Sequence, residues 1–599
     1  MNDDNSPFDR RGFLKTAGAT VTVAAFAGCA GDDNGDAGGS APPGDAGDLV
    51  EMDGFSVPRD NVAPSSELSG DQEIRELELI VNPPDATPND YETCEVIAEA
   101  ASELGLDIEV NTMTWSAQSE AVWDGRDWDM TFWEMVGRPS RLDPDEFLYQ
   151  MFHTDRMNGY NYYFWDGGDY DEVVENQRQE VDEDLRQPTV QECQEIIHER
   201  GPSTFILYPE NTFAWNSDEW ENVVDLSGMG IVNPISFSQM EPRSDDETLV
   251  LSYDTEIQNI NPFNQSGEVD MIQHRMLWDR LVWPDEDALP SPRLATELDW
   301  IDDTTLEVPF IEGHQFHDGT EVLAEDVKYS FEIHDTSLDH GWDTWFTAAV
   351  EPIENIEIVD DYRVRFNLEY PFAPFLMATL GRIAIVSKQY WEDRIETMDA
   401  GNIMDDQEEE PMGSGPMEFE HWRRDEEVSL TRYDDHFDPI DYDGRVTRII
   451  PSVQTTLSQL EEGTVDMLGI YGGDQNVLED RVNDSDHLSL QSTVSAGFKQ
   501  VSYNYEKAPF HIDAFRRAMN HRTNKELIVE QIFDGWGDIP LNSPTSSALG
   551  FWHNSDLERY DFDLQAAANE LIEAGFMWDE EEGRLHMPAD QTEAPTYDA

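Results

Sequence analysis

The chain has 599 residues, of which 39 % are hydrophobic, so it is long enough for more than one globular core and too apolar to be disordered through its bulk. It carries 128 acidic residues against 36 basic ones, a formal net charge of −92. A surface of this sign repels nucleic-acid phosphates and anionic membranes, which excludes a role in binding DNA or RNA.

The acidic residues are spread along the whole chain rather than gathered in one tail, and only six of the basic residues are lysines. At low ionic strength such charges repel one another across the folded surface. In about 1 M salt the Debye length falls to about 3 Å, and this repulsion is screened. The charge pattern therefore predicts a protein adapted to concentrated salt.

The N-terminal 29 residues have the order of an export signal. Arg10 and Arg11 precede an apolar run over 17–28, which is too short to span about 30 Å of hydrocarbon as a helix. The run ends in Phe-Ala-Gly-Cys, which resembles a lipobox with Cys29 as the lipidated residue. Together these features resemble a twin-arginine lipoprotein signal over 1–29. An ordinary N-terminal helix is the alternative.

A flexible tether is predicted for residues 30–74. Its first part is rich in Gly, Asp, Ala and Pro and has no apolar periodicity. No other segment of the sequence is a candidate for a membrane span.

An α/β pattern begins where the tether ends. Residues 77–81 (LELIV) predict a short buried strand, residues 91–104 have helical periodicity, and residues 106–113 (LDIEVNTM) predict a second strand. This order favours parallel strands with helical crossovers.

The next elements are bounded by prolines. Residues 171–200 are predicted to be largely helical with an interruption near Pro188. Residues 203–209 (STFILYP) predict a buried strand that ends at Pro209, and residues 249–254 (LVLSYD) begin a new set of strands.

Two cysteines remain once Cys29 is assigned to the lipid. Cys94 and Cys193 both lie in segments with helical pattern. Outside the cell they can form a disulfide, and two buried free thiols are an equal alternative. No group of Cys or His has the spacing of a metal site, so the sequence predicts neither a metal nor a cofactor.

Residues 292–332 carry the strongest local motif, PRLATELDWIDDTTLEVPFIEGHQFHDGTEVLAEDVKYSFE. It predicts a strand, a tight turn through His317-Asp318-Gly319, and a helix with acidic residues in its first turn. His317 and Asp318 are interpreted as turn architecture rather than as catalytic groups or metal ligands. The segment resembles the hallmark of the family-5 solute-binding proteins of ABC importers, which bind oligopeptides, dipeptides or nickel.

Other segments resemble the same family in a shifted order. The pieces at 251–263, 502–537 and 560–576 follow the family order, and the part that should come next resembles 77–113 and 128–187 near the front of the chain. The chain is therefore interpreted as a circular permutation of the family. A partial tandem duplication is the alternative, but residues 75–240 do not repeat anything later.

The resemblance implies an α/β, two-lobed periplasmic-binding-protein-like fold with an extra subdomain, circularly permuted. Lobe I is expected over 205–500, and lobe II is expected to be split between 75–204 and 501–599. The two hinge strands are expected near 205–208 and 500–504.

The function implied by this resemblance is that of an extracytoplasmic substrate-binding lipoprotein. It would hold a small solute, an oligopeptide or dipeptide first of all, and deliver it to an ABC permease and ATPase. The resemblance places it as a monomer on the outer face of the cytoplasmic membrane, and the charge pattern is that of proteins from salt-loving archaea. A sensory binding protein that feeds a receptor is one alternative. A secreted hydrolase is another, although neither G-x-S-x-G nor HExxH occurs.

Site residues follow from the segment 129–138, which resembles the family's cleft-lining element. In peptide-binding relatives an acidic residue after this element holds the peptide's α-ammonium, whereas here Gly137 or Arg138 stands there. Glu134 is the nearest acidic substitute, and Arg138 is suited to a carboxylate or phosphate. The expected ligand-binding residues are Trp133, Glu134, Arg138, Tyr162 and Trp165, faced by Phe263 and Asn264, with Asn504 at the hinge. Each is alternatively a core or surface residue, and Trp133→Ala is expected to weaken binding with little loss of fold.

Overall fold

The computed structural model describes residues 49–597 except 158, 245–246, 265–266, 339, 343, 399–400 and 407–410. The predicted signal, Cys29 and the first part of the tether lie outside the described residues. Within the described part, no helix is both long and apolar enough to cross a membrane.

The expectation of a flexible tether does not hold from residue 49 onward. Strand β1 (Leu49–Glu51) pairs with β2 (Ser56–Pro58), and β3 (Val62–Ala63) pairs with a strand from the C-terminal region. Phe55 and Val57 are buried in the main core. These apolar side chains explain why the chain is ordered here rather than solvated.

The predicted strand–helix–strand unit is confirmed. Strand β4 (Leu77–Val81) lies parallel to β5 (Ile108–Thr112), and α2 (Pro88–Ser102) connects them. The helix begins with proline at its first turn and buries Cys94 and Ile97 on one face.

A strand from the far end of the sequence completes this sheet. Strand β6 (Met130–Met135) lies beside β4, and β22 (Phe498–Tyr503) is inserted between β6 and β7 (Ser203–Asn216). We call the set β5–β4–β6–β22–β7 the β4 sheet. Because β22 pairs with β6 along its length, residues 75–200 do not fold as an independent domain.

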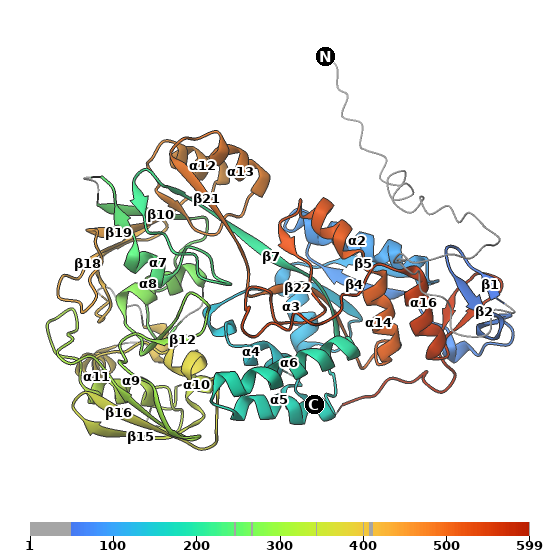
Figure 1. Ribbon diagram of the computed structural model, residues 1–599, viewed down its shortest axis with the longest axis horizontal. Helices are drawn as coiled ribbons and strands as arrows, with labels where there is room; N and C mark the ends of the chain where they lie inside the picture. Colours follow the sequence, from blue (N-terminus) through green and yellow to red (C-terminus); the bar gives the residue numbers. More distant parts are fainter. Residues whose placement is uncertain are drawn as a thin grey trace, which may run out of the picture. The chain divides into compact units, whose positions relative to one another are not determined.

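Strand β7 does not end at Pro209, contrary to the prediction. Its first residues pair with β22 up to Leu207, and from Glu210 onward it pairs with β21 (Leu488–Val494) (Figure 1). Pro209 lies where β7 changes partner from β22 to β21, and there it is paired with Gly537 of the short strand β23 (Gly537–Asp538). Its carbonyl accepts from Ser495 N at 2.8 Å. The strand therefore runs on through the proline.

A second set of strands shares β7. Strand β10 lies between β19 and β20, both parallel to it, and β18 and β17 follow outward from β19. The set, called the β10 sheet, comprises β10 (Thr248–Tyr253), β17 (Met417–Arg423), β18 (Glu427–Arg432), β19 (Gly444–Ile449) and β20 (Met467–Leu468), together with the second part of β7 and β21. Helices α12 (Val453–Glu461) and α13 (Gln475–Asn483) bury their apolar residues in a separate small core. The chain thus passes between the two sheets along β7 and again between β21 and β22.

A four-stranded antiparallel sheet carries the hallmark motif. Its order is β13 (Asp299–Asp302), β14 (Thr305–Pro309), β16 (Arg363–Leu368) and β15 (Ile353–Asp360). The predicted turn and helix are confirmed: Gly319 has φ +82°, and α9 (Ala324–Glu332) follows.

His317 is part of this architecture, as the sequence predicted. Its Nδ1 accepts from Gly413 N at 3.2 Å and its Nε2 donates to Gly415 O at 3.0 Å. Burial lowers the pKa of His317 to about 4. A Cβ at Gly413 would lie 1.8 Å from Leu277 O, so this close approach requires glycine.

The helical region before β7 is interrupted at a different place from the one predicted. Helix α5 (Asp169–Gln179) ends before α6 (Glu183–Arg200), and Pro188 lies inside α6. Asp182 caps α6 by accepting from Leu185 N. Pro188 therefore follows the capped first turns, where it removes one backbone hydrogen bond without breaking the helix.

The C-terminal region closes onto the β4 sheet. Helix α14 (Asp513–Arg522) packs on α16 (Leu564–Glu573), and β24 (Met577–Asp579) pairs with β3 and with β25 (Leu585–His586). Trp578 is fully buried and donates from Nε1 to Leu104 O at 2.9 Å. The first and last described parts of the chain thus build one core.

Candidate functional site

A cavity of about 400 Å³ is lined by two separate regions of the chain. One region, 138–178, follows β6 and belongs to the β4-sheet side, and it includes α4 (Asp145–Phe152). The other, 271–382, lies between β10 and β17 and includes α8 (Glu268–Leu277) and the short helix η6 (Phe375–Leu380). The cavity is therefore lined by regions that lie far apart in the sequence.

The lining of this cavity has an unusual charge for this chain. It holds seven arginines, namely Arg138, Arg141, Arg156, Arg178, Arg275, Arg280 and Arg382. Its carboxylates are only Asp145, Glu146 and Glu351, although acidic residues outnumber basic ones 128 to 36 in the sequence. We call this cavity the arginine pocket.

Arg178 joins the two sides of the arginine pocket at one edge. Its Nε lies 3.1 Å from Asp145 Oδ1, and its guanidinium lies 3.6 Å from the centre of the Tyr149 ring. The same guanidinium lies 5.0 Å from the Phe372 ring, and Ala373 N donates to Arg178 O at 2.6 Å. This arginine is held by stacking and by an ion pair.

Arg280 is buried beneath the pocket and is only 3 % exposed. Its Nε donates to Arg382 O at 3.1 Å, and its Nη1 donates to Trp278 O at 3.4 Å. Burial, together with the charge of Arg275, lowers the pKa of Arg280 to about 9. Hydrogen bonds to carbonyl groups offset only a small part of the free-energy cost of removing a guanidinium from water.

Arg141 has a similar environment on the opposite side. It is 6 % exposed and donates to Val136 O. Its guanidinium lies 5.3 Å from the Phe147 ring, and within the described part of the chain its Nε has no hydrogen-bond partner. Burial lowers the pKa of Arg141.

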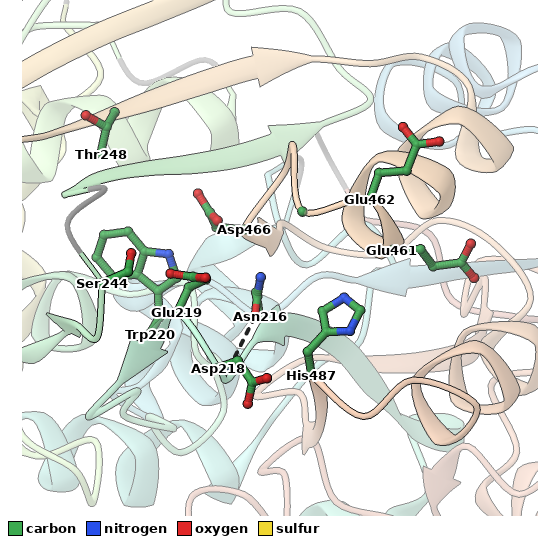
Figure 2. Close-up of a pocket in the computed structure, with 11 residues that line it drawn as sticks. Asn216, Asp218, Glu219, Trp220, Ser244, Thr248, Glu461, Glu462, Asp466 and His487 are labelled. Atoms are coloured by element: carbon green, nitrogen blue, oxygen red, sulfur yellow. Dashed lines mark hydrogen bonds between the residues drawn. The ribbon is translucent and has the colours of Figure 1, made fainter.

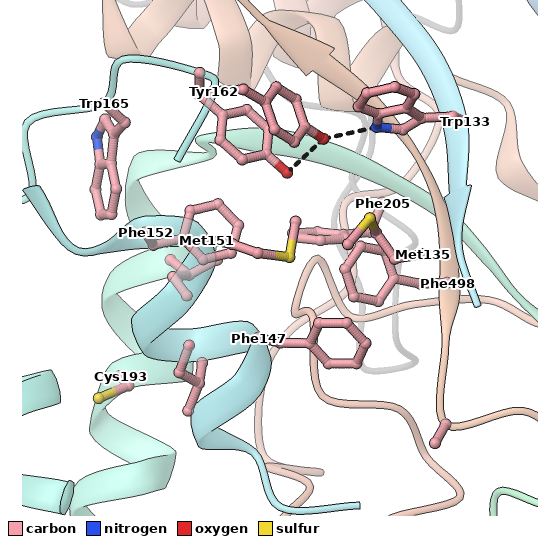
Figure 3. Packing of buried hydrophobic residues seen from close by; sticks show 14 of the residues in the cluster. Trp133, Met135, Phe147, Met151, Phe152, Tyr162, Trp165, Cys193, Phe205 and Phe498 are labelled. Carbon is pink, nitrogen blue, oxygen red and sulfur yellow. Dashed lines mark hydrogen bonds between the residues drawn. The ribbon is translucent and has the colours of Figure 1, made fainter. Parts of the chain in front are cut away.

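Trp133 and Tyr162, both predicted from the sequence, form the base of an aromatic cluster. Trp133 Nε1 donates to Tyr162 Oη at 2.7 Å, and the two rings meet edge-on at 5.0 Å (Figure 3). Trp123 packs on both, and Tyr160, which lines the arginine pocket, packs on Trp123 at 5.4 Å. Trp133 itself is 3 % exposed, so Trp133→Ala would empty a core position and cost about 3–5 kcal/mol. The expectation of little loss of fold is therefore revised.

The other predicted residues on the β4-sheet side are placed differently from one another. Glu134 lies 2.8 Å from Lys499 Nζ, which also contacts Asp90 at 3.0 Å. Trp165 is buried against Phe152 and Tyr170. Arg138 is exposed and lines the arginine pocket.

Phe263, Asn264 and Asn504 do not line this pocket. Phe263 is buried against Trp391, with ring centres 4.7 Å apart, and Asn264 Nδ2 donates to Met404 O at 3.3 Å. Asn504 is fully buried and donates to Trp128 O at 2.9 Å. Among the eight predicted residues, Arg138 is thus the one that the structure brings to the pocket, and the other six arginines were missed.

A second cavity of about 400 Å³ has the opposite character. Its lining includes the carboxylates Asp218, Glu219, Glu461, Glu462 and Asp466, together with His487, all near one end of the β10 sheet (Figure 2). The lining follows the acidic composition of the chain, and only one side of the molecule contributes to it. In charge, this cavity is therefore like the rest of the protein surface.

A buried group of two histidines and an aspartate was also missed by the sequence. The Nε2 atoms of His314 and His436 lie 3.0 and 3.2 Å from Asp279 Oδ2, and all three side chains are fully buried. Burial alone would raise the pKa of Asp279, but the two histidines outweigh it and hold this pKa well below its usual range. The distances are those of hydrogen bonds, and the carboxylate is satisfied by its two donors.

The two buried cysteines are both free thiols. Of the two alternatives for Cys94 and Cys193, a disulfide or two buried free thiols, the structure shows the free thiols.

Comparisons with known proteins give one consistent result. The profile of the bacterial extracellular solute-binding proteins, family 5 (Middle), matches residues 40–159 and 290–598, which together are more than half of the chain. The oligopeptide-binding protein AppA of Bacillus subtilis is 26 % identical over 310 residues, covering 50 % of this chain and 54 % of the relative. The heme-binding protein A of Haemophilus influenzae is 26 % identical over 289 residues, covering 45 % and 49 %.

The solved structure of AppA from Bacillus subtilis in complex with a nonapeptide is 21 % identical, with a TM-score of 0.43, and covers 57 % of this chain and 66 % of that one. The chain spans about half the length of the curated relatives it matches.

Proposed function

Because the chain belongs to the bacterial extracellular solute-binding proteins of family 5, we propose that it captures a small solute in the arginine pocket and delivers it to a membrane permease. The observation that carries this proposal is a cavity lined from both sides of a molecule whose two sheets are joined through β7 and the connection between β21 and β22. Ligand sites commonly lie where such parts meet, and a bound solute would favour their closed arrangement. Peptides are the first candidates, because the Bacillus relative is named for binding oligopeptides.

The proposal includes the division into two lobes. Residues 75–204 and 501–599 form lobe II, residues 205–500 form lobe I with the four-stranded sheet as its extra subdomain, and the chain is a circular permutation of the family. Two contacts support this: β22 lies between β6 and β7, and Trp578 is bonded to Leu104 O. The second connection is drawn at 495–497 rather than at the expected 500–504, because β22 pairs with β6 from Phe498 onward. This moves residues 498–500 from lobe I to lobe II.

The partner in this proposal is an ABC permease with its ATPase. A receptor that senses the loaded protein is the alternative partner. Recovery of a permease and ATPase with the loaded protein from membranes would support transport, and recovery of a receptor would support sensing.

Filling the pocket is expected to remove the bound solute. Ala348 lines the arginine pocket and is exposed in it, so Ala348→Trp places a large ring in the space that the solute needs. In about 2 M KCl, which keeps the charges screened, the wild type should co-purify with a solute that mass spectrometry detects. The variant is expected to lose at least about tenfold in affinity for it.

Ala86→Trp is the matched control, because Ala86 is exposed and does not line the pocket. It should bind as the wild type does. Equal retention of solute by both variants would contradict capture in this pocket. Conversion of the solute into a product on incubation would favour a hydrolase instead.

We also propose that the chain is anchored as a lipoprotein through Cys29 on the outer face of the cytoplasmic membrane, where it acts as a monomer. Support comes from the arginine pair, the apolar run and the Phe-Ala-Gly-Cys end of the signal. Cys29→Ser is expected to be exported but released into the medium, as fractionation and blotting would measure. Replacing Arg10 and Arg11 by lysine should block export of both forms, and a Cys29→Ser protein that stays on the membrane would contradict the lipid anchor.

A further inference from the structure

The arginine pocket gathers a scarce residue. The sequence has 30 arginines in 599 residues, and seven of them line this one cavity, where only three carboxylates join them. The acidic cavity near the β10 sheet has five carboxylates in its lining and no arginine. A surface under general selection for acidic residues would supply carboxylates to both cavities. The excess of arginine in the first cavity is therefore explained by the ligand that this cavity contacts.

The three carboxylates of the pocket are too few to neutralise its seven arginines. Asp145 is already engaged by Arg178 at 3.1 Å and by Gln177 Nε2 at 2.6 Å. Within the part of the chain that the structure describes, Arg138 and Arg382 make no ion pair.

Three of the pocket arginines are more than nine-tenths buried, Arg141 on one side and Arg275 and Arg280 on the other. Arg280 is 3 % exposed and donates to backbone carbonyl groups, and Arg141 is 6 % exposed and has a buried Nε without a partner among the described residues. Burial lowers the pKa of Arg280 and of Arg141, and it outweighs Asp279, which raises the first pKa, and Glu146, which raises the second. Among the described residues neither guanidinium forms an ion pair. An anion placed in direct contact would offset the cost of burying these cations. Because one such cation lies on each side, an anionic ligand would be held by both.

We infer that the solute captured in the arginine pocket is an anion with at least two acidic groups, carboxylate or phosphate, one facing Arg141 and the other facing Arg280 and Arg382. This inference rests on the proposed function and specifies its solute. The planar guanidinium matches carboxylate and phosphate oxygens in pairs. Tyr149 and Tyr370, which also line the cavity, provide apolar surface for the rest of the solute.

In concentrated salt, the buried arginines are the ones that can hold an anion. At about 1 M salt the Debye length is about 3 Å, so a net charge cannot attract a ligand over any distance. Attraction between groups in direct, desolvated contact survives, because ions cannot enter between them. A protein that works in concentrated salt can therefore recognise an anion only through close contacts of this kind.

The test is calorimetry in about 2 M KCl on protein freed of bound solute, with four probes. These are the tripeptides Glu-Glu-Glu and Gln-Gln-Gln, which differ in charge and hardly in size, and the non-peptide anions citrate and pyrophosphate. At least one of the three anions is expected to bind about tenfold or more tightly than Gln-Gln-Gln, as one or two charge-assisted contacts imply. Preference for Glu-Glu-Glu would identify an acidic peptide, for citrate a polycarboxylate, and for pyrophosphate a phosphorylated solute.

Variants assign the effect to the pocket. Arg382→Gln should lower the affinity for the preferred anion by about tenfold or more and leave the affinity for Gln-Gln-Gln unchanged. Arg382→Lys keeps the charge but not the planar guanidinium, so its affinity for the anion should lie between those of the wild type and Arg382→Gln. Arg243→Gln is the control, because Arg243 is exposed and lies outside the pocket. Its binding should equal that of the wild type, and equal melting temperatures would exclude loss of fold in all three.

If Gln-Gln-Gln binds as tightly as the three anions, or if a neutral solute co-purifies with the protein, the inference of an anionic solute is wrong. The proposal that the protein captures a solute would still stand. Absence of any co-purified solute and of binding by every probe would instead overturn the capture function, and the anionic solute with it.

Discussion

Replacing Asp143 by asparagine is expected to lower the free energy of unfolding by about 3–5 kcal/mol. Asp143 and Arg186 form a two-pronged ion pair, with both N–O distances 2.7 Å and side-chain exposures of 7 % and 2 %. Gln177 Oε1 accepts from Arg186 Nε at 3.0 Å, which fixes the guanidinium in place. Asparagine keeps the shape and removes the charge, so the buried Arg186 loses its counter-ion and cannot move to solvent.

Urea denaturation at constant high salt would measure this loss. The exposed pair of Arg59 and Glu580, with side-chain exposures of 50 % and 32 %, supplies the control. Glu580→Gln should change the free energy of unfolding by only about 0–1 kcal/mol, because solvent and salt screen an exposed pair. If the two variants lose the same stability, burial is not what makes the Asp143 pair important.

The melting temperature is expected to rise steeply with KCl. Two like charges about 10 Å apart in water repel by roughly 0.4 kcal/mol, so a few dozen unscreened pairs amount to a repulsion on the order of 10 kcal/mol. The net charge of −92 supplies that many pairs. With an unfolding entropy of roughly 2 cal/mol/K per residue, removing this repulsion raises the melting temperature of a chain of this length by about 10 °C.

Calorimetric melts from about 0.1 M to about 2 M KCl would measure the rise, since the Debye length shortens from about 10 Å to under about 3 Å over this range. Sucrose at matched osmolality is the control, because it favours the compact state by exclusion but does not screen charge. A melting temperature that stays flat in KCl, or that rises equally in sucrose, would contradict adaptation through the acidic surface.

Local patterns in the sequence predicted the elements that local forces decide. The unit from Leu77 to Thr112 and the turn at Gly319 follow from apolar periodicity and from a backbone conformation that glycine favours. Pro188 and Pro209 misled the prediction, because neither proline ends its element. Helix α6 continues past Pro188 with one backbone hydrogen bond fewer, and β7 continues past Pro209 by pairing with β23 and β21.

The candidate site was less accessible to sequence reasoning. The resemblance drew attention to Trp133, which the structure buries beneath Trp123 and Tyr160 rather than in the pocket. The arginines of the pocket are scattered from position 138 to position 382, and no local pattern connects them. The scarcity of basic residues made each arginine notable, but only the fold brings seven of them to one cavity.

The position of β22 sets an order for assembly during synthesis. The ribosome makes β6 and β7 early, and the strand that lies between them follows about 360 residues after β6. At bacterial or archaeal elongation rates that interval is roughly 20–70 s, during which both strands present unpaired backbone along one edge. Such edges recruit other chains unless something keeps those chains apart. This topology therefore leaves two strand edges open for longer than one in which the central strand is made between its neighbours, and the negative charge of the nascent copies keeps them apart only where salt does not screen it.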